Sequence, residues 1–298
     1  MAALRAGSVS ARQGGAPHRP SSLRRHAFVL GCCIWALSAA GFACAADPGV
    51  DASPAAPAPS ATSLCLPDLD GALSAAEARA QVGATARVLV QAAPFAMLPD
   101  LEGAVDAAGR RIVDWRLQRD GVEQAMAVED GGSGWWAAEW PDLRADLAIP
   151  LDRDQALLGL YRQDDDGLWL LAIASAAPNP PRGRTLIRYE APLPVLRTPL
   201  RAGDAWTATI ATSGTLDGLP WQGVDAWQVR ATAGGRIELP DFSAGPTLRV
   251  RSEVEVRSVL GPTVRRTQIS WMFECMGELG RATLDGSGAL IERRLLRP

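Results

Sequence analysis

Alternating apolar and polar residues are the most constraining feature of this sequence. In the segment 248–257, arginine and glutamate alternate with Leu248, Val250, Val254 and Val256. A period of two directs apolar side chains to one face of a β-strand and charged side chains to the other. Similar short segments, separated by Gly, Pro and Asp, recur along the chain. The sequence therefore predicts a mainly β protein: an antiparallel curved sheet or incomplete β-barrel with one or two short helices.

Two hairpins are predicted from the turn residues between such segments. Leu157–Gln163 and Leu168–Ser175 flank three aspartates and a glycine, and glycine readily adopts the positive φ angles of tight turns. Asp120-Gly121 is predicted to turn the strand around Trp115 back into Val122–Val128. Hairpins of this kind are a usual unit of an antiparallel sheet.

One short helix is predicted ahead of these strands. Ser74 and Glu77 have the spacing of a capping box, in which each side chain bonds the backbone N–H of the other residue. Gly83 is expected to end this helix. After Gly83 the helical signals fade, and Ala86–Gln91 is the next predicted strand.

Residues 1–45 have the pattern of a secretory signal peptide. A basic region is followed by an apolar run from Ala27 to Ala43, and Ala43-Cys44-Ala45 offers the small residues of a cleavage site. Lipoprotein processing at Cys44 and an uncleaved anchor are the alternatives. The sequence therefore predicts export, to the periplasm or the extracellular space.

The rest of the chain divides into a linker and a folded region. Residues 46–63 are mainly Pro, Ala and Ser, which cannot bury enough apolar surface to become ordered, so a disordered linker is predicted. Residues 64–298 are predicted to form a β-rich domain. Pro178–Gly183 breaks the strand pattern, and it either divides this domain or is a long connection within one sheet.

The cysteines predict one disulfide. Cys32, Cys33 and Cys44 lie in the leader, so cleavage would leave Cys65 and Cys275 as an even pair in an oxidising compartment. The alternative is two independent buried thiols. A bond between the two would tie the first part of the folded region to its last strands.

Charge argues against nucleic acid as a partner. The chain has 30 basic and 33 acidic residues, and the leader holds five of the arginines and no acidic residue. The remainder carries 25 positive and 33 negative side chains, a net charge of −8. Binding to nucleic acid or to an anionic membrane needs clustered positive charge instead.

The residue types also limit the possible chemistry. Both histidines, His18 and His26, lie in the leader, and the chain has no lysine. Ser-His-Asp triads, Cys-His dyads, histidine metal sites and lysine Schiff bases are therefore excluded after cleavage. Carboxylates, hydroxyls, arginines and backbone groups remain, and no catalytic residue, cofactor or metal site is predicted.

Two acidic groups have the composition of possible sites. Asp164–Asp166 offers clustered oxygens to Ca²⁺, but no further ligand follows at regular spacing, so a solvated turn is the better interpretation. Glu253 and Glu255 share a strand face with arginines, which keep both carboxylates ionised. Since a general acid needs an apolar pocket instead, catalysis is not predicted at this pair.

Tryptophan is abundant, and one group of tryptophans is a candidate site. Trp135, Trp136 and Trp140 gather in a Gly-rich segment. Such side chains offer flat apolar faces and one donor each, which suits sugars, peptides or an apolar ligand. If this segment is a strand, the adjacent Trp135 and Trp136 point to opposite sides, so at least one belongs to the core. Core packing and a ligand-binding platform both remain open.

Short motifs in the second half carry a resemblance to a known group. They are Asp165–Leu170, Pro194, Leu200–Trp206, Trp271, Gly277, Gly280 and Arg281. Residues from about 156 to 290 resemble bacterial envelope proteins and lipoproteins whose incomplete β-barrel is similar in shape to the periplasmic lipoprotein carriers. The segment 239–246 is longer here than the compact turn of that group. The resemblance implies a half-barrel and no particular ligand.

The best-supported function is a non-catalytic binding or accessory module of the cell envelope. Its partner would be an apolar ligand, a lipid, a peptide or an envelope protein, given the negative charge, the tryptophans and the missing catalytic groups. One alternative is a structural or assembly protein. Another is a carboxylate-based hydrolase of cell-wall or exported polysaccharide, which needs two acidic groups about 5–10 Å apart across a cleft. Its candidates are Glu139, Glu190, Glu274 and Glu278.

Overall fold

The computed structural model describes residues 65–259 and 261–298. The predicted signal peptide (residues 1–45) and linker (residues 46–63) lie outside the described residues. Two short helices are present, α1 (Ala75–Ala78) and α2 (Trp136–Glu139). In the described part of the chain, no helix is long and apolar enough to cross a membrane.

The strands form one 15-stranded sheet. They are β1 (Thr85–Ala92), β2 (Ala104–Val105), β3 (Arg111–Asp114), β4 (Val122–Ala127), β5 (Glu129–Asp130), β6 (Leu147–Pro150), β7 (Leu157–Asp164), β8 (Gly167–Ser175), β9 (Leu186–Arg197), β10 (Ala205–Leu216), β11 (Leu219–Glu238), β12 (Ser243–Ser258), β13 (Val264–Phe273), β14 (Gly277–Asp285) and β15 (Leu290–Arg297). From β6 to β15, each strand pairs antiparallel with the next. The prediction of a mainly antiparallel β fold with short helices is confirmed.

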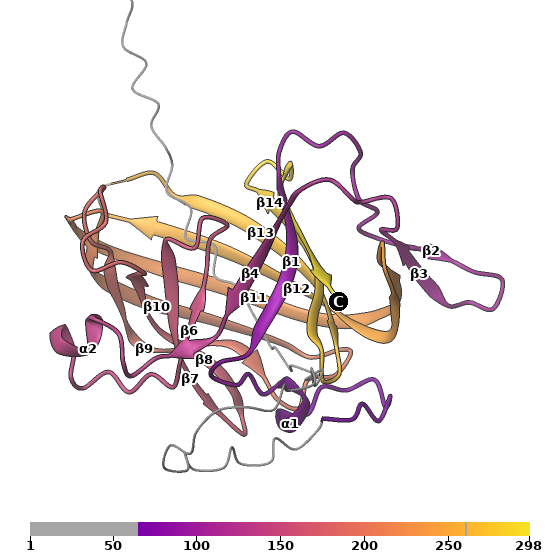
Figure 1. The fold of residues 1–298 in the computed structure, drawn as a ribbon, viewed down its shortest axis with the longest axis horizontal. Coiled ribbons are helices and arrows are strands. Elements are labelled where there is room, and N and C mark those ends of the chain that lie inside the picture. The colour runs from indigo at the N-terminus through magenta and orange to yellow at the C-terminus, as the bar shows by residue number, and fades with distance from the viewer. Residues whose placement is uncertain (1–64, 260) are drawn as a thin grey trace, which may run out of the picture.

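The sheet curves until its two edges meet. In the strand order, β4 lies at one end and β5 at the other, yet the two follow each other in the chain with only Val128 between them. β4 also contacts β6, the partner of β5. One continuous segment therefore belongs to both edges, and the result is a nearly closed barrel (Figure 1).

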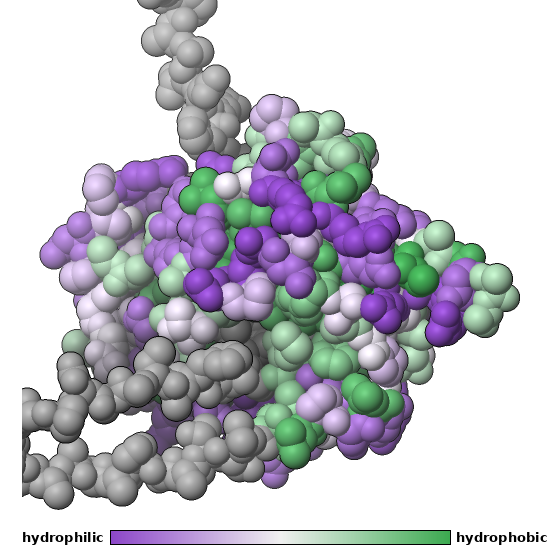
Figure 2. Space-filling view, turned by 45° about the vertical axis from the view of Figure 1, so that its right-hand side comes forward, coloured by the Kyte–Doolittle hydropathy of each residue, from purple (hydrophilic) through white to green (hydrophobic). Residues whose placement is uncertain are grey.

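The inner wall of this barrel is largely apolar. Leu248, Val250, Val254 and Val256 of β12 are all buried in one cluster with Trp227, as their alternation predicts. The outer surface is mixed, and Figure 2 shows hydrophilic and hydrophobic residues interspersed over the visible face. Because burial of apolar area is the main favourable term in folding, this inner cluster is the principal stabilising element of the barrel.

Two further apolar clusters lie on the outside of the sheet. In one, Trp115 packs edge to face against Trp271 with ring centroids 4.8 Å apart, close to the β2–β3 hairpin. β3 pairs in parallel with β11, which holds this hairpin against the barrel. In the other, Trp136 at the start of α2 packs over β6, β7 and β8. The outer clusters account for apolar residues that face away from the barrel interior.

The segment 65–84 covers one end of the barrel. Leu73 and Leu200 exchange backbone hydrogen bonds of 2.8 and 2.9 Å, and Ala80 bonds the side chain of Gln163 through both its N–H and its C=O. These partners lie beside the β9–β10 connection and the β7–β8 turn, which share one end of an antiparallel barrel. The predicted Cys65–Cys275 disulfide is present and holds the same segment to the β13–β14 turn.

Three local predictions differ from the structure. The capping box of Ser74 and Glu77 is present, but α1 ends at Ala78 because Arg79 is extended, well before Gly83. Asp120-Gly121 does not join a hairpin: β4 pairs with β1, and β3 pairs with β2 and β11. The reason is that the chain turns directly after β3: the N–H of Gln118 donates to the carbonyl oxygen of Trp115 at 3.0 Å, while Trp115 itself stays buried on the same face as Val113. The third difference concerns the tryptophan segment, described below.

Candidate functional site

A cavity of about 500 Å³ opens at the end of the barrel opposite the segment 65–84. Three connections surround it: β6–β7, β8–β9 and β10–β11. Its floor is the inner face of β13, β14 and β15. In chain order the lining residues are Ala92, Leu151–Asp154, Ala156, Leu157, Ser175, Pro180–Gly183, Thr185, Asp217, Arg266, Gln268, Thr283, Ile291, Glu292 and Arg294.

The β6–β7 connection is shaped by Asp152. Its Oδ1 accepts hydrogen bonds from the backbone N–H groups of Ala156 at 2.8 Å and Leu157 at 3.2 Å. Burial raises the pKa of Asp152, and these two hydrogen bonds oppose the rise. The side chain thus closes a tight loop on one wall of the cavity, because Asp readily bonds backbone groups a few residues on.

The β8–β9 connection forms the facing wall. Pro180 and Pro181 restrict its backbone, and Gly183 has φ of +91°. A Cβ atom at Gly183 would lie 2.6 Å from the carbonyl oxygen of Asp217, so only glycine allows the two loops to approach this closely. The side chain of Asp217 accepts a hydrogen bond from Arg182 at 3.2 Å, which ties the two loops together.

The floor of the cavity is polar and buried. Arg266 and Arg294 are only 7% and 3% exposed, and Gln268 and Thr283 are paired across β13 and β14. Arg294 Nε donates to Glu292 Oε1 at 2.6 Å, and its Nη2 donates to the carbonyl oxygen of Leu151 at 3.2 Å. Two cationic side chains are therefore held inside the barrel mouth, where the low dielectric strengthens their interactions with any bound group.

Further polar residues continue this strip into the barrel. Ser270 Oγ donates to Glu278 Oε2 at 2.7 Å, and Arg281 Nε donates to Glu278 Oε1 at 3.0 Å. Burial raises the pKa of Glu278, while the charge of Arg281 acts in the opposite direction. On the opposite wall, Tyr189 donates to Asp225 at 2.6 Å. The interior therefore has apolar walls with charged groups set into them.

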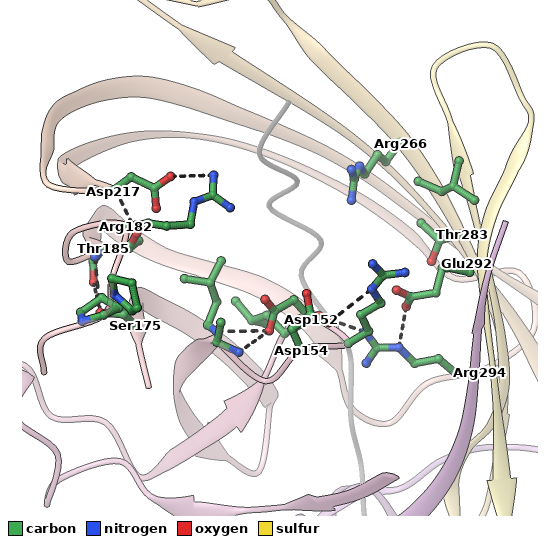
Figure 3. A pocket seen from close by; sticks show the side chains of 18 of the residues that line it. Asp152, Asp154, Ser175, Arg182, Thr185, Asp217, Arg266, Thr283, Glu292 and Arg294 are labelled. Atoms are coloured by element: carbon green, nitrogen blue, oxygen red, sulfur yellow. Dashed lines mark hydrogen bonds and ion pairs between the residues drawn. The ribbon is translucent and has the colours of Figure 1, made fainter. Parts of the chain in front are cut away.

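Charged residues are spread around the cavity. Figure 3 shows Arg266, Glu292 and Arg294 on one side, Arg182 and Asp217 on the other, and Asp152 and Asp154 between them. Apolar residues also line the cavity: Ala92, Leu151, Leu157, Pro180, Pro181 and Ile291. Cavities that combine apolar lining with a few placed polar groups are typical small-molecule sites. The arrangement suits an amphiphile, which has an apolar chain and a polar end.

The tryptophan segment lies on the outside of the barrel and is not a strand. Trp136 opens α2, is buried, and donates from Nε1 to the carbonyl oxygen of Gly131 at 2.8 Å. Trp135 Nε1 donates to the carbonyl oxygen of Ser175, behind the cavity wall, and Trp140 is half-buried under Arg188. A helical turn replaces the strand that was considered for this Gly-rich segment, and Trp136 belongs to the core. A ligand-binding role for Trp135, Trp136 and Trp140 stays a prediction, and none of the three lines the cavity.

The acidic residues that the sequence offered as possible sites, in the segment 164–166 and at Glu253 and Glu255, bond to nearby residues. Asp164 accepts hydrogen bonds from Trp169 Nε1 and the backbone of Asp166 within the β7–β8 turn. Glu255 accepts a hydrogen bond from Arg265 at 2.7 Å, which lowers the pKa of this carboxyl. Glu253 contacts Arg251 at 2.8 Å. These contacts support a structural turn and a strand face on which both glutamates pair with arginine.

The four glutamates of the hydrolase alternative do not line the cavity. Glu139 pairs with Arg184 on the outer surface, and Glu190 is exposed. Glu274 binds backbone N–H groups at the opposite end of the barrel, and Glu278 is bonded to Ser270 and Arg281. Of the acidic residues that do line the cavity, Asp154, Asp217 and Glu292 pair with arginine, and Asp152 accepts backbone hydrogen bonds. Burial raises the pKa of Asp217, and the charge of Arg182 opposes the rise.

The polar residues of the cavity floor were not predicted as a site from the sequence. In β13 the apolar residues Ile269 and Trp271 face one way, and Arg266 and Gln268 face the other. Such a strand normally turns its polar face to water. Here the apolar face packs under the β2–β3 hairpin and the polar face lines the barrel. The polar face of β13 lies inside the barrel because the β2–β3 hairpin covers the apolar face from the outside. No residue pattern within β13 predicts that covering layer.

Comparison of the chain with protein-family models, with curated proteins and with solved structures found no match.

Proposed function

We propose that this protein is an exported, non-catalytic binding module of the cell envelope that holds an amphiphilic ligand in the mouth of its barrel. The observation that carries the proposal is the cavity of about 500 Å³ with apolar walls and buried arginines on its floor. This volume lies within the range of about 300–1,000 Å³ that is usual for small-molecule sites.

The shape of the barrel favours a ligand that enters from one end. The segment 65–84 covers the other end and is held there by the Cys65–Cys275 disulfide. An apolar chain would lie against Leu151, Leu157 and Ile291, where burial of its methylene groups provides the affinity. A polar or anionic end group would meet the guanidinium groups on the cavity floor, which fix its orientation.

Export is part of the same proposal. The signal-peptide pattern of residues 1–45 supports it, and the disulfide is consistent with an oxidising compartment. A secreted or periplasmic protein with an apolar cavity would shield such a ligand from water. The sequence left a lipid, a peptide and an envelope protein open as partners. Of these, the cavity best suits an amphiphile of lipid type.

A fluorescent fatty acid, dansyl-undecanoic acid, tests the proposal. Its emission should rise on binding to the purified protein, because the dansyl group enters an apolar site. Ala156→Trp adds bulk at the exposed rim of the cavity and should weaken binding by roughly tenfold or more. Ala107→Trp adds the same bulk at an exposed position of the β2–β3 connection and should leave binding unchanged.

Thermal unfolding of both variants provides the folding control. If Ala156→Trp unfolds at the wild-type temperature and still binds the probe with wild-type affinity, the cavity is not the site. If the wild-type protein does not bind the probe, the amphiphile proposal is contradicted.

A further inference from the structure

A second site lies at the covered end of the barrel, far from the cavity. Carboxylate oxygens of Asp68, Glu77 and Glu274 lie within 4.8 Å of one another. Asp68 and Glu77 come from the segment 65–84, and Glu274 comes from the β13–β14 turn. Two chain regions separated by about two hundred residues thus bring three negative charges to one point.

Two of these carboxylates are buried without a compensating cation. Glu77 is 7% exposed and Glu274 is 2% exposed. Among the described residues, no arginine forms an ion pair with Glu77, Glu274 or Asp68, and Arg79 pairs with Asp165 at 2.8 Å instead. Burial of an ionised carboxylate is costly unless a cation or metal balances it. The described residues therefore satisfy these two carboxyl groups with hydrogen bonds from Ser74, Leu69 and Gly71, and place no positive charge against them.

Glu77 also has an oxygen available for a ligand. Its Oε2 accepts hydrogen bonds from the N–H of Ser74 at 2.9 Å and from the hydroxyl of Ser74 at 2.7 Å. Its Oε1 accepts no hydrogen bond from any residue in the described ranges 65–259 and 261–298. A buried carboxyl group with one oxygen that accepts no hydrogen bond, grouped with two further carboxyl groups, has the arrangement of a hard-cation ligand.

The spacing of the loop independently matches a calcium-binding pattern. Asp68, Asp70, Gly71, Ser74 and Glu77 stand where the twelve-residue EF-hand loop has its third, fifth, sixth, ninth and twelfth residues. Gly71 has φ of +78°, as the sharp turn at the sixth position requires. The twelfth residue of that loop is the bidentate glutamate, and here it is Glu77.

The first position of the pattern is occupied by Leu66, whose side chain cannot bind a cation. Glu274 supplies a carboxylate from the other chain region instead. Its Oε2 accepts a hydrogen bond from the N–H of Leu69 at 2.6 Å, and its Oε1 accepts one from the N–H of Gly71 at 3.1 Å. The adjacent Cys275 is bonded to Cys65, three residues before Asp68, so a covalent link holds Glu274 against the loop.

We propose that Asp68, Glu77 and Glu274 form a calcium-binding site that locks the segment 65–84 onto the end of the barrel. By the loop pattern, the side chain of Asp70 at the fifth position and the carbonyl oxygen of Ala72 at the seventh would complete the oxygen ligands. Ca²⁺ is favoured over Mg²⁺, because a flexible loop with several carboxylates suits the larger ion, whereas Mg²⁺ demands a rigid octahedron. The site is independent of the proposed amphiphile binding.

Calcium titration of the full-length, oxidised protein after treatment with EDTA tests the proposal. Equilibrium dialysis should show one Ca²⁺ per chain, with half-saturation on the order of 0.1–1 mM as in extracellular modules. The melting temperature should rise with Ca²⁺ concentration and fall back when EDTA is added. No uptake of Ca²⁺ at millimolar concentration by folded protein would overturn the proposal.

Two variants locate the ion. Asp68→Asn removes an exposed carboxylate, and Glu77→Gln keeps an acceptor for the capping box, so both are expected to fold. Each should weaken Ca²⁺ binding by at least about tenfold, since affinity follows the number of charged ligands. Asp166→Asn, in the exposed acidic turn between β7 and β8, should bind as wild type. If Asp166→Asn loses the ion and Asp68→Asn keeps it, the assignment is wrong.

Discussion

Cys275 forms a disulfide with Cys65, 210 positions earlier in the chain. The bond joins the β13–β14 turn to the beginning of the segment 65–84. That segment is further held by the exchange of hydrogen bonds between Leu73 and Leu200. One end of the barrel is therefore closed by covalent and backbone contacts, and the cavity lies at the other end.

Removal of the disulfide should destabilise the protein. The double variant Cys65→Ser/Cys275→Ser should have a free energy of unfolding about 2–4 kcal/mol lower than the oxidised wild type, since the cross-link restricts the unfolded chain. Urea unfolding measures the difference. Equal unfolding midpoints, together with alkylation of both thiols in untreated wild-type protein, would contradict the role of this bond.

A methyl group at Gly280 should also destabilise the fold. A Cβ atom there would lie 2.8 Å from Cζ3 of Trp115, which is buried against Trp271 and has no room to move. Gly280→Ala should cost about 1–3 kcal/mol in chemical unfolding, as overpacked cores do. Gly132→Ala is the matched control: its nearest contact is 3.4 Å away, so a change within about 0.5 kcal/mol is expected. A reversed order would show that Trp115 is not a rigid anchor.

The strand pattern made most of the fold predictable, and the departures have physical causes. The hairpin of β7 and β8 follows from local alternation and turn residues, and the structure contains it. The position of β4 beside β1 could not be inferred from Asp120-Gly121, since the two strands are far apart in the chain. Closure of the barrel through Val128 depends on the curvature of the whole sheet, which no single segment encodes.

Stability should depend on pH through Asp225. Burial raises the pKa of Asp225 well above that of an ordinary aspartate, to about 6, and the hydrogen bond from Tyr189 opposes the rise. The folded state therefore binds the proton more tightly than the unfolded state. Asp225 therefore makes its full contribution to stability below about pH 4, and this contribution is lost as the pH rises through about 6. The free energy of unfolding falls by roughly 2–3 kcal/mol over that range.

Asp225→Asn isolates this contribution. Because Asn carries no charge at any pH, the variant should gain roughly 2 kcal/mol relative to wild type between pH 4.5 and pH 8. Urea unfolding at the two pH values gives the comparison, and Asp166→Asn serves as an exposed control with no such gain. A stability difference that does not change with pH would contradict the raised pKa of Asp225.

The buried pair of Glu278 and Arg281 should show strong coupling. Both side chains are almost fully buried, with Arg281 Nη2 2.8 Å from Glu278 Oε1. Arg281→Met alone should cost about 3–5 kcal/mol, because it leaves the Glu278 carboxylate buried without its partner. The double variant Glu278→Leu/Arg281→Met should cost less than the sum of the single variants. Additive losses in a double-mutant cycle would show that the two residues act separately.

The binding site was less predictable than the fold. The tryptophans of the segment around Trp136 were candidates for ligand binding because of their flat apolar faces, yet α2 packs them on the outer surface of the barrel. Arg266 and Arg294 were overlooked because charged residues at alternating positions normally face water. Their burial depends on the closure of the barrel around them, which is a property of the whole fold.

The most direct test of ligand binding in the barrel mouth is a crystal structure with a fatty acid brominated at the end of its chain. Anomalous scattering locates the bromine without reference to the protein. The signal should lie in the cavity among Leu151, Leu157 and Ile291, with the carboxylate close to Arg266 or Arg294. A bromine signal confined to the outer surface, or no signal at saturating ligand, would contradict the proposed function.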